Sequence, residues 1–205
     1  TRRRRARPAR WPTGWCRVPR WCGGSWSRAP RRSARTSRRC AGRWMRRCAP
    51  EYGGGVLKAG DKAPAIALED QDGRRRTLRE FAGRKVLVYF YPKADTPGCT
   101  QQSCLLRDVR DEIGRTVIVG VSPDAPARQK KFDDKYGLGF PLLSDVDHVV
   151  ARAYKVWKKK SMYGREYMGI ERSAFLVGAD GRVLHAWYKI SPKDTPLRLL
   201  EALGR

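Results

Sequence analysis

The sequence predicts an α/β fold in which a mixed β-sheet carries helices on both faces. Two continuous apolar runs, KVLVYFY at 85–91 and TVIVGVS at 116–122, are typical of strands that are covered on both sides. Helical segments alternate with these strands, and a hairpin and a final helix follow them. From about residue 60 to residue 205 the chain is long enough to form one domain with its own core.

The first part of this domain shows clear turn and helix signals. The segment 66–83 predicts a hairpin around Asp72 and Gly73, because Asp-Gly favours a tight turn, and then a short helical turn. After the strand at 85–91 and a loop with Pro and Gly, we expect a helix that begins near Cys99 and ends at Gly114. Cys104 is expected on the apolar face of this helix.

The second part is predicted in the same way. The segment 124–137 should form a helix with Asp124 as its N-cap, Pro126 in its first turn and Gly137 at its end. Lys158–Lys160 are interpreted as a solvated run, and Trp157 and Tyr163 as surface-loop residues, with a place at the substrate mouth as the alternative. The remaining expected elements are a short strand at 140–145, a helix at 147–156, two strands around an Ala-Asp-Gly turn at 172–188, and an amphipathic helix at 191–204.

The first fifty residues differ in composition from the rest. They hold 17 arginines, five tryptophans, no lysine and no acidic residue, whereas residues 51–205 hold 28 basic and 20 acidic residues. No helical or strand period occurs there, and like charges oppose compaction, so we interpret 1–55 as a disordered extension and 56–205 as the domain. A mis-set start or a fragment is the first explanation of the extension, and a basic arm or a transit peptide are the alternatives.

The cysteines and the apolar runs indicate in which cellular compartment the protein works and whether it binds a membrane or a metal. No run in the extension has the length of a signal-peptide core or a membrane span, so we expect no membrane association. The four cysteines of the extension have spacings of C-x5-C and C-x7-C, wider than the pairs of structural zinc sites, so no metal is expected. Nothing indicates export, and the domain holds only Cys99 and Cys104, which predicts a cytoplasmic, reducing compartment.

Cys99 and Cys104 lie in the stretch YPKADTPGCTQQSC, which follows a buried strand and opens a helix. At a helix N-terminus the dipole and the unpaired N–H groups favour a thiolate, although Asp95 would oppose this unless it points away. In an intact helix, Cα atoms five residues apart are separated by about 8–9 Å, whereas a disulfide needs about 7 Å or less. A permanent disulfide is therefore excluded as long as the helix is intact. A metal site is not expected, because further ligands are missing. The remaining interpretation is a redox pair that forms a disulfide only after the helix unwinds locally.

The segment Pro92 to Cys99 has the P-x-x-x-T-x-x-C pattern of peroxiredoxins. Together with the C-x4-C pair and GIERSAFLV at 169–177, it resembles the bacterioferritin comigratory protein, or peroxiredoxin Q, subfamily over about residues 57–205. Four spaced residues, Pro92, Thr96, Cys99 and Arg172, match this pattern. The extension matches nothing in the family.

The resemblance implies a thioredoxin-like fold and a thiol peroxidase that reduces hydrogen peroxide and organic hydroperoxides without a cofactor. It implies that Cys99 attacks the peroxide and that Cys104 then forms an intramolecular disulfide with it, which thioredoxin or a similar dithiol reduces. It further implies that Thr96 and Arg172 hold the thiolate and the peroxide, and that Pro92 shields the pocket. We expect a monomer.

Ionisation of a thiol does not by itself explain such an activity. For cysteines in general, a rise in the thiolate fraction at pH 7 from about 3% to about 90% increases the amount of the reactive form about 30-fold. The accompanying loss of nucleophilicity is about 10- to 18-fold, by the slope measured for disulfide exchange. The larger contribution must come from donors directed at the O–O bond, which assigns Arg172, Thr96 and the helix N–H groups a role in the transition state.

Two other functions remain open. A general thiol-disulfide oxidoreductase of the same fold is disfavoured because such enzymes use C-x-x-C. Nucleic-acid binding through the Arg/Trp-rich extension would rest on phosphate neutralisation and stacking, and it is compatible with peroxidase activity. Peroxide consumption with thioredoxin distinguishes a peroxidase from a general oxidoreductase. A salt-dependent shift of DNA by the full chain, but not by a chain without residues 1–50, would support nucleic-acid binding by the extension.

Overall fold

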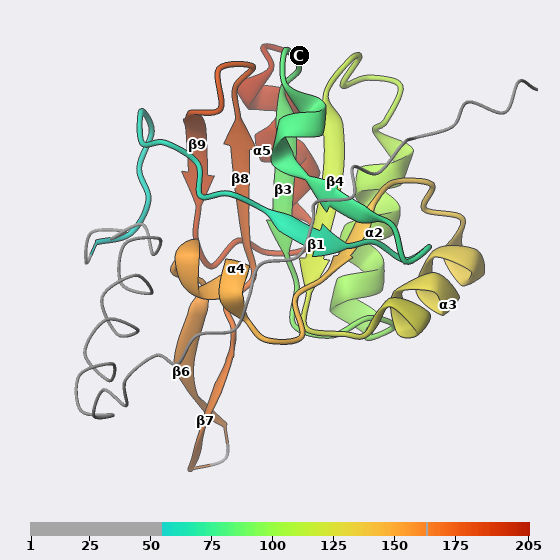
Figure 1. Cartoon of the computed structure of the whole chain (residues 1–205), viewed down its shortest axis with the longest axis vertical. Coiled ribbons are helices and arrows are strands. Elements are labelled where there is room, and N and C mark those ends of the chain that lie inside the picture. The colour runs from blue at the N-terminus through green and yellow to red at the C-terminus, as the bar shows by residue number, and fades with distance from the viewer. Residues whose placement is uncertain (1–54, 163) are drawn as a thin grey trace, which may run out of the picture. The chain divides into compact units, whose positions relative to one another are not determined.

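The computed structural model describes residues 55–162 and 164–205 (Figure 1). The interpretations of the N-terminal extension, including its cysteines and a nucleic-acid contact, lie outside the described residues. The described chain forms a seven-stranded sheet and a separate two-stranded hairpin. The strands are β1 (Ala67–Glu69), β2 (Arg75–Thr77), β3 (Val86–Phe90), β4 (Val117–Ser122), β5 (Leu142–Ser144), β6 (Trp157–Met162), β7 (Arg165–Ile170), β8 (Ser173–Val177) and β9 (Val183–Trp187).

The sheet is mixed, with the order β2-β1-β5-β4-β3-β8-β9. The central strands β3, β4 and β5 are parallel, and all other neighbours in the sheet are antiparallel. All five residues of β3 are buried, as the continuous apolar run predicted. Because β3 and β4 are parallel, their carboxyl ends meet at one edge of the sheet, where the loop that leads to Cys99 begins.

Helices cover both faces of the sheet, which confirms the predicted fold class (Figure 1). Alternate residues of β3 enter two cores: Val88 and Phe90 face one, and Leu87 and Tyr89 face the other. The first core is closed by η1 (Leu78–Phe81) and α4 (Val149–Ala153). The second is closed by α2 (Pro97–Asp108), α3 (Pro126–Tyr136) and α5 (Asp194–Ala202).

The helix that carries both cysteines is shorter than predicted. It ends at Asp108 rather than at Gly114, and the backbone N–H groups of Arg110 and Glu112 bond to carbonyls three residues back. Such bonds tighten the chain so that it can turn back into β4. The fully buried side chains of this helix belong to Cys99, Gln102, Ser103 and Leu106, while Cys104 is half-buried.

The predicted N-cap Asp124 was wrong, although Pro126 does begin α3. The N-cap is Ala125. The carboxylate of Asp124 instead accepts hydrogen bonds from the backbone N–H of Ala94 at 2.6 Å and from the Ser122 hydroxyl at 2.9 Å. A tertiary contact with the loop before Cys99 thus takes the carboxylate away from the helix end.

The surface loop predicted at Trp157 was also wrong, because Trp157 and the three lysines that follow it belong to the hairpin β6–β7. The strands are too polar to show an apolar alternation, and cross-strand pairs such as Lys159 with Glu166, 2.5 Å apart, accompany the ladder. Tyr163 lies outside the described residues.

The β1–β2 hairpin depends on the buried carboxylate of Asp70, and its replacement by Asn should destabilise the fold. Asp70 accepts bonds from the backbone N–H of Asp72 and Arg74 and from Arg76 Nε. Burial opposes its ionisation, but these bonds outweigh burial and hold the pKa below its usual value. We expect Asp70→Asn to lower the free energy of unfolding at pH 7 by about 1–3 kcal/mol in urea titrations.

The pH dependence gives this prediction a second readout. Because the folded pKa is lowered, the stabilisation is present above the unfolded pKa of 3.8 and is lost as the pH falls below it. The acid loss of stability should therefore be smaller in Asp70→Asn than in the wild type. The control is Asp72→Asn, which removes an exposed ion pair with Lys130 and should cost less than about 1 kcal/mol. Equal unfolding curves for the two variants would contradict the role of Asp70.

Candidate active site

Cys99 is the third residue of α2 and is 1% exposed. Thr96 is the N-cap, and Pro97 occupies the first helical position, where its missing N–H has no cost. The Thr96 carbonyl accepts the bond from the Thr100 N–H at 2.8 Å, so the helix begins directly after this cap. The sulfur of Cys99 therefore lies at the positive end of the helix, as the sequence predicted.

The loop before this helix is held by α3 and the end of β4. The Ala94 N–H binds Asp124, and Arg128 donates to the Ala94 carbonyl at 3.1 Å. The next carboxylate, Asp95, accepts from Tyr136 Oη at 2.7 Å and from Lys135 Nζ at 2.9 Å. The bond from Tyr136 and then that from Lys135 lower the pKa of Asp95. Asp95 is thus engaged by α3, which meets the condition that it should not oppose a thiolate at Cys99.

Arg172 joins β7 to β8 and reaches the cysteine from the other end of the sequence. Its Nη2 donates to the sulfur of Cys99 at 3.3 Å, and its Nη1 donates to Oε1 of Gln102 on the same helix. Gln102 in turn donates to Thr195 Oγ1 at 2.8 Å, and Thr195 donates to the Ser191 carbonyl at 3.0 Å. The guanidinium is therefore oriented by a continuous chain of hydrogen bonds that ends in α5 and the turn before it.

A glycine allows this close approach. A Cβ atom at Gly98 would lie 3.4 Å from Arg172 Nη2, so a larger side chain at this position would press against the guanidinium. The backbone of Arg172 is held as well, because its carbonyl accepts from the Ile190 N–H at 3.1 Å. Both ends of the arginine are therefore fixed relative to the sulfur.

Thr96 and Pro92 lie in the loop before Cys99. The Thr96 hydroxyl donates to the Lys93 carbonyl at 3.0 Å, which leaves its oxygen free to accept a hydrogen bond from a bound molecule. Pro92 is exposed just beyond the end of β3. Arg172 and Cys99 are thus in direct contact, while Thr96 and Pro92 border the same helix end.

Cys104 lies in the same unbroken helix as Cys99. Both are free thiols, and Cys104 is half-buried beside the core of α2, α3 and α5. The helix that the sequence argument required is therefore present. The intervening residue Ser103 shares a hydrogen bond of 2.9 Å with Tyr89, and burial raises the pKa of Tyr89, which keeps this phenol neutral beside the site.

Gln102 and Thr195 were not predicted from the sequence as residues of this site. Gln102 had a usable signal, because it stands three residues after Cys99 and so shares its helix face. Thr195 had none, because its contact with Gln102 spans 93 positions and depends on how α5 packs.

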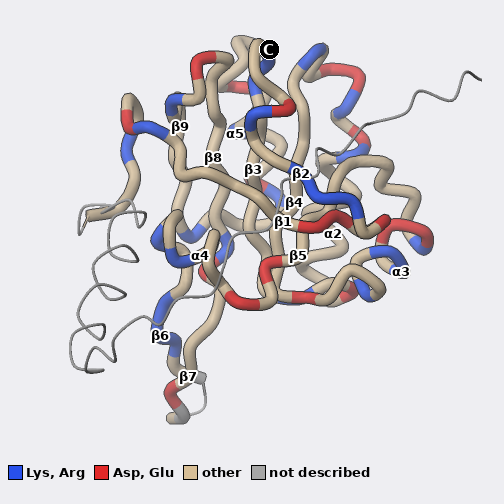
Figure 2. The backbone as a smooth tube through the Cα atoms, in the orientation of Figure 1, with Lys and Arg blue, Asp and Glu red and all other residues tan. Residues whose placement is uncertain are grey.

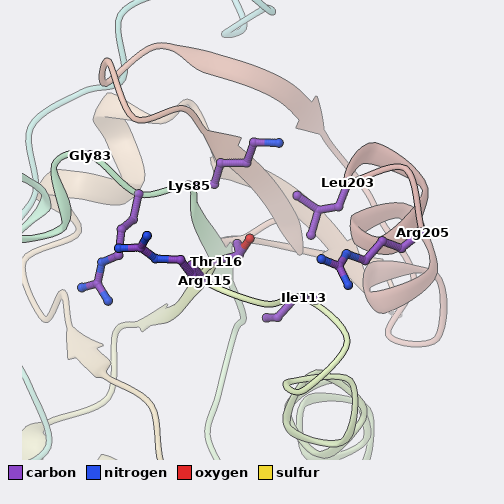
Figure 3. A pocket seen from close by; sticks show the side chains of 8 residues that line it. Gly83, Lys85, Ile113, Arg115, Thr116, Leu203 and Arg205 are labelled. Carbon is purple, nitrogen blue, oxygen red and sulfur yellow. The ribbon is translucent and has the colours of Figure 1, made fainter.

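A cavity of about 270 Å³ lies away from this site (Figure 3). Its lining includes Gly83, Lys85, Arg115 and Thr116, which precede β3 and β4, whereas Cys99 follows the opposite end of β3. No three His, Cys, Asp or Glu side chains gather as a metal site within the described residues. In the same part of the chain, no helix has the length and apolar character needed to cross a membrane.

Known proteins are similar in sequence to the part of the chain that contains this site. The profile of the AhpC/TSA family matches residues 59–186. Peroxiredoxin Bcp of Escherichia coli K12 is 50% identical over 133 residues, which are 64% of this chain and 85% of that protein. Peroxiredoxin Bcp of Bacillus subtilis is 42% identical over 150 residues, or 72% of this chain and 96% of that protein.

Solved structures agree with the sequence relatives. The bacterioferritin comigratory protein of Xanthomonas campestris, described for its alkyl peroxide reduction activity, matches with a TM-score of 0.64 and 38% identity over 68% of this chain and 90% of that one. Peroxidoxin BcpB of Mycobacterium tuberculosis matches with a TM-score of 0.65 and 33% identity over 72% and 97%. The fold is therefore thioredoxin-like, as expected. The chain belongs to the AhpC/TSA family and is a peroxiredoxin, a thiol peroxidase that takes a peroxide as substrate and requires a reductant.

Proposed function

We propose that this peroxidase reduces hydrogen peroxide and organic hydroperoxides through Cys99 and Cys104 and is regenerated by thioredoxin. The contact of 3.3 Å between Arg172 Nη2 and the Cys99 sulfur is the observation that carries the proposal. A guanidinium at this distance favours the thiolate and stands next to the position where a peroxide must approach the sulfur.

In the first step, the thiolate of Cys99 attacks one oxygen of the peroxide ROOH. An S–O bond forms and the O–O bond breaks, so the sulfur becomes a sulfenic acid and the leaving RO⁻ takes up a proton to give ROH. Negative charge develops on the leaving oxygen. The N–H groups of Arg172 and of the first turn of α2 are donors for this charge, and the Thr96 oxygen can accept a hydrogen bond from the peroxide O–H group. Pro92 shields the mouth of the site.

In the second step, the Cys104 thiol attacks the sulfenic acid, and a disulfide and one water molecule form. In the intact helix the two Cα atoms are about 8–9 Å apart, which is beyond disulfide range. The first turns of α2 must therefore unwind before this step. Thioredoxin then reduces the disulfide by thiol exchange, which returns both cysteines to thiols and oxidises the thioredoxin.

This cycle accounts for the remaining expectations. Both cysteines belong to one helix of one chain, so the reaction needs no second copy, in keeping with a monomer. Reduction by thioredoxin fits a protein that works in a cytoplasmic, reducing compartment. The domain at 56–205 contains every residue that the cycle uses.

Replacement of Cys104 by Ser tests the second step. We expect Cys104→Ser to consume about one peroxide per Cys99 with wild-type kinetics and then to stop with thioredoxin, thioredoxin reductase and NADPH, because no disulfide can form. Mass spectrometry should show a Cys99–Cys104 disulfide in the wild type after one equivalent of peroxide, and faster overoxidation of Cys99 in the variant. Sustained NADPH oxidation by Cys104→Ser at the wild-type rate would remove Cys104 from the mechanism.

A further inference from the structure

The hairpin β6–β7 leads directly into the arginine of the active site. Its strands pair from Trp157 with Ile170 to Met162 with Arg165, and the hairpin extends away from the seven-stranded sheet (Figure 1). Three consecutive lysines, Lys158–Lys160, mark β6 as a basic strand (Figure 2). Because β7 ends at Ile170, only Glu171 separates the hairpin from Arg172.

Successive lysines of β6 lie on opposite faces of the strand, because the strand is pleated, and they have different partners. Lys159 is exposed and pairs with exposed Glu166, 2.5 Å away. On the other face, Lys158 Nζ binds the buried carboxylate of Glu171 at 2.6 Å, and Lys160 Nζ donates to the Ile170 carbonyl. The two lysines of this face therefore hold the two residues that precede Arg172.

The side chain of Lys160 packs against Gly169 of the neighbouring strand on its way to the Ile170 carbonyl. A Cβ atom at Gly169 would lie 3.6 Å from Cδ of Lys160, so the side chain of Lys160 crosses the neighbouring strand over Gly169. It is half-buried there, with its ammonium group at the base of the hairpin, on the side toward the active site.

We propose that Lys160 is a positioning residue of the peroxidase site. It fixes the Ile170 carbonyl and with it the chain from which Arg172 reaches Cys99, and it adds a second positive charge to the surroundings of the sulfur. The inference rests on the proposed function, since it assigns Lys160 to the reaction that begins at Cys99.

The surroundings of the ammonium group support a link to Cys99. Burial lowers the pKa of Lys160 below its usual value of 10.5, and the charge of Arg172 lowers it further. The carboxylate of Glu171 and the sulfur of Cys99 raise it. These three groups, Lys158 on the same face of β6 and Tyr167 as the cross-strand neighbour are the titratable or charged groups that face Lys160. Lys160 and the sulfur of Cys99 are therefore close enough to interact electrostatically.

The first test compares two lysines of one strand. We expect Lys160→Met to lower kcat/KM for hydrogen peroxide by about tenfold at pH 7, because a buried charge and an anchor of Arg172 are lost together. Lys159→Met, which removes the same charge from the opposite face, should stay within about twofold of the wild type. Lys160→Arg should restore most of the activity, since a guanidinium can donate to the same carbonyl.

The pH profile separates a charge effect from a purely structural one. Raising the pH removes the proton from Lys160 and with it the positive charge, and its lowered pKa places this loss below 10.5. The wild-type kcat/KM should therefore fall on an alkaline limb below about pH 10.5. In Lys160→Arg this limb should move up by at least about one pH unit, because arginine stays protonated.

Two results would overturn the inference: equal kcat/KM for Lys160→Met and Lys159→Met, or an alkaline limb that is the same in Lys160→Arg and the wild type. The comparison of the alkaline limbs does not use Lys160→Met, so it tests the inference even where that variant does not fold. Alkylation of Cys99 by iodoacetamide, followed by peptide mapping, needs no peroxidase activity and should be slower in Lys160→Met than in Lys159→Met. An inactive wild type with this alkylation difference would reject the proposed function alone, and equal alkylation rates would reject the role of Lys160.

Discussion

Cys99→Ser should lower the peroxidase rate by at least about 10³-fold, because a serine hydroxyl is not ionised at neutral pH and is a weak nucleophile without an adjacent base. Cys99 is 1% exposed and differs from serine by one atom, so the variant should keep its fold. Arg172 and Gln102 would remain in place, since their mutual hydrogen bond does not involve the sulfur. Peroxide consumption, followed with thioredoxin, thioredoxin reductase and NADPH, measures the loss.

The matched control is Cys104→Ser, which removes the other thiol of the same helix. It should still reduce one equivalent of peroxide in a single turnover, whereas Cys99→Ser should reduce none. Circular dichroism should show the same helix content in both variants. Wild-type turnover by Cys99→Ser would show that the chemistry begins at another residue, and the proposed mechanism would then be wrong.

Arg172→Met should lower kcat/KM for peroxide by about 10²–10³-fold, the usual effect of removing a donor that stabilises developing charge. The guanidinium contacts the Cys99 sulfur through Nη2 and is oriented through Nη1 by Gln102. Lysine has a single charged nitrogen and cannot make both contacts in this geometry, so Arg172→Lys should recover only part of the rate. Competition with a second peroxidase for limiting hydrogen peroxide measures such rate constants directly.

Alkylation shows whether Arg172 acts on the thiolate or on the peroxide. Iodoacetamide reacts with the same sulfur but has no O–O bond, so a loss that is specific to peroxide must arise at the leaving oxygen. We expect alkylation of Cys99 to slow only several-fold in Arg172→Met, in the Cys104→Ser background. An exposed arginine of α5, Arg198, provides the control, and Arg198→Met should leave both rates unchanged. Equal losses in the two reactions would contradict a transition-state role.

The fold class followed from local patterns because its central strands are insulated from solvent on both sides. The runs at 85–91 and 116–122 contain little besides apolar residues, so their burial could be predicted without a partner. The hairpin around Asp72 and Gly73 was likewise predictable from its turn. The hairpin β6–β7 was not, because its strands carry lysines and other polar residues on both faces.

The helix of the two cysteines shows where local signals stop being sufficient. Its start was predicted near Cys99, within two residues of the observed start at Pro97, because a proline in the first turn is a local signal of a helix N-terminus. Its predicted end was wrong, because the turn toward β4 decides where the helix must stop. The prediction of Asp124 as an N-cap was wrong for a related reason. Its carboxylate is suited to cap a helix, but it accepts a hydrogen bond from the backbone N–H of Ala94, 30 residues away.

By itself the sequence determined the family motif and the distance between its two cysteines, which is too large for a disulfide in an intact helix. The spacing of Cys99 and Cys104 in one helix follows from helix geometry, and the match of Pro92, Thr96 and Arg172 follows from their pattern. Only the tertiary structure decided how Arg172 is held: by Gln102 and Thr195 on one side and by the base of the β6–β7 hairpin on the other. The reason is physical: the bonds of Arg172 to Gln102 and of Gln102 to Thr195 join segments 70 and 93 residues apart, and such bonds depend on packing that no local pattern encodes. The bond of Lys160 to Ile170 spans only 10 residues, but it depends on the pairing of two polar strands.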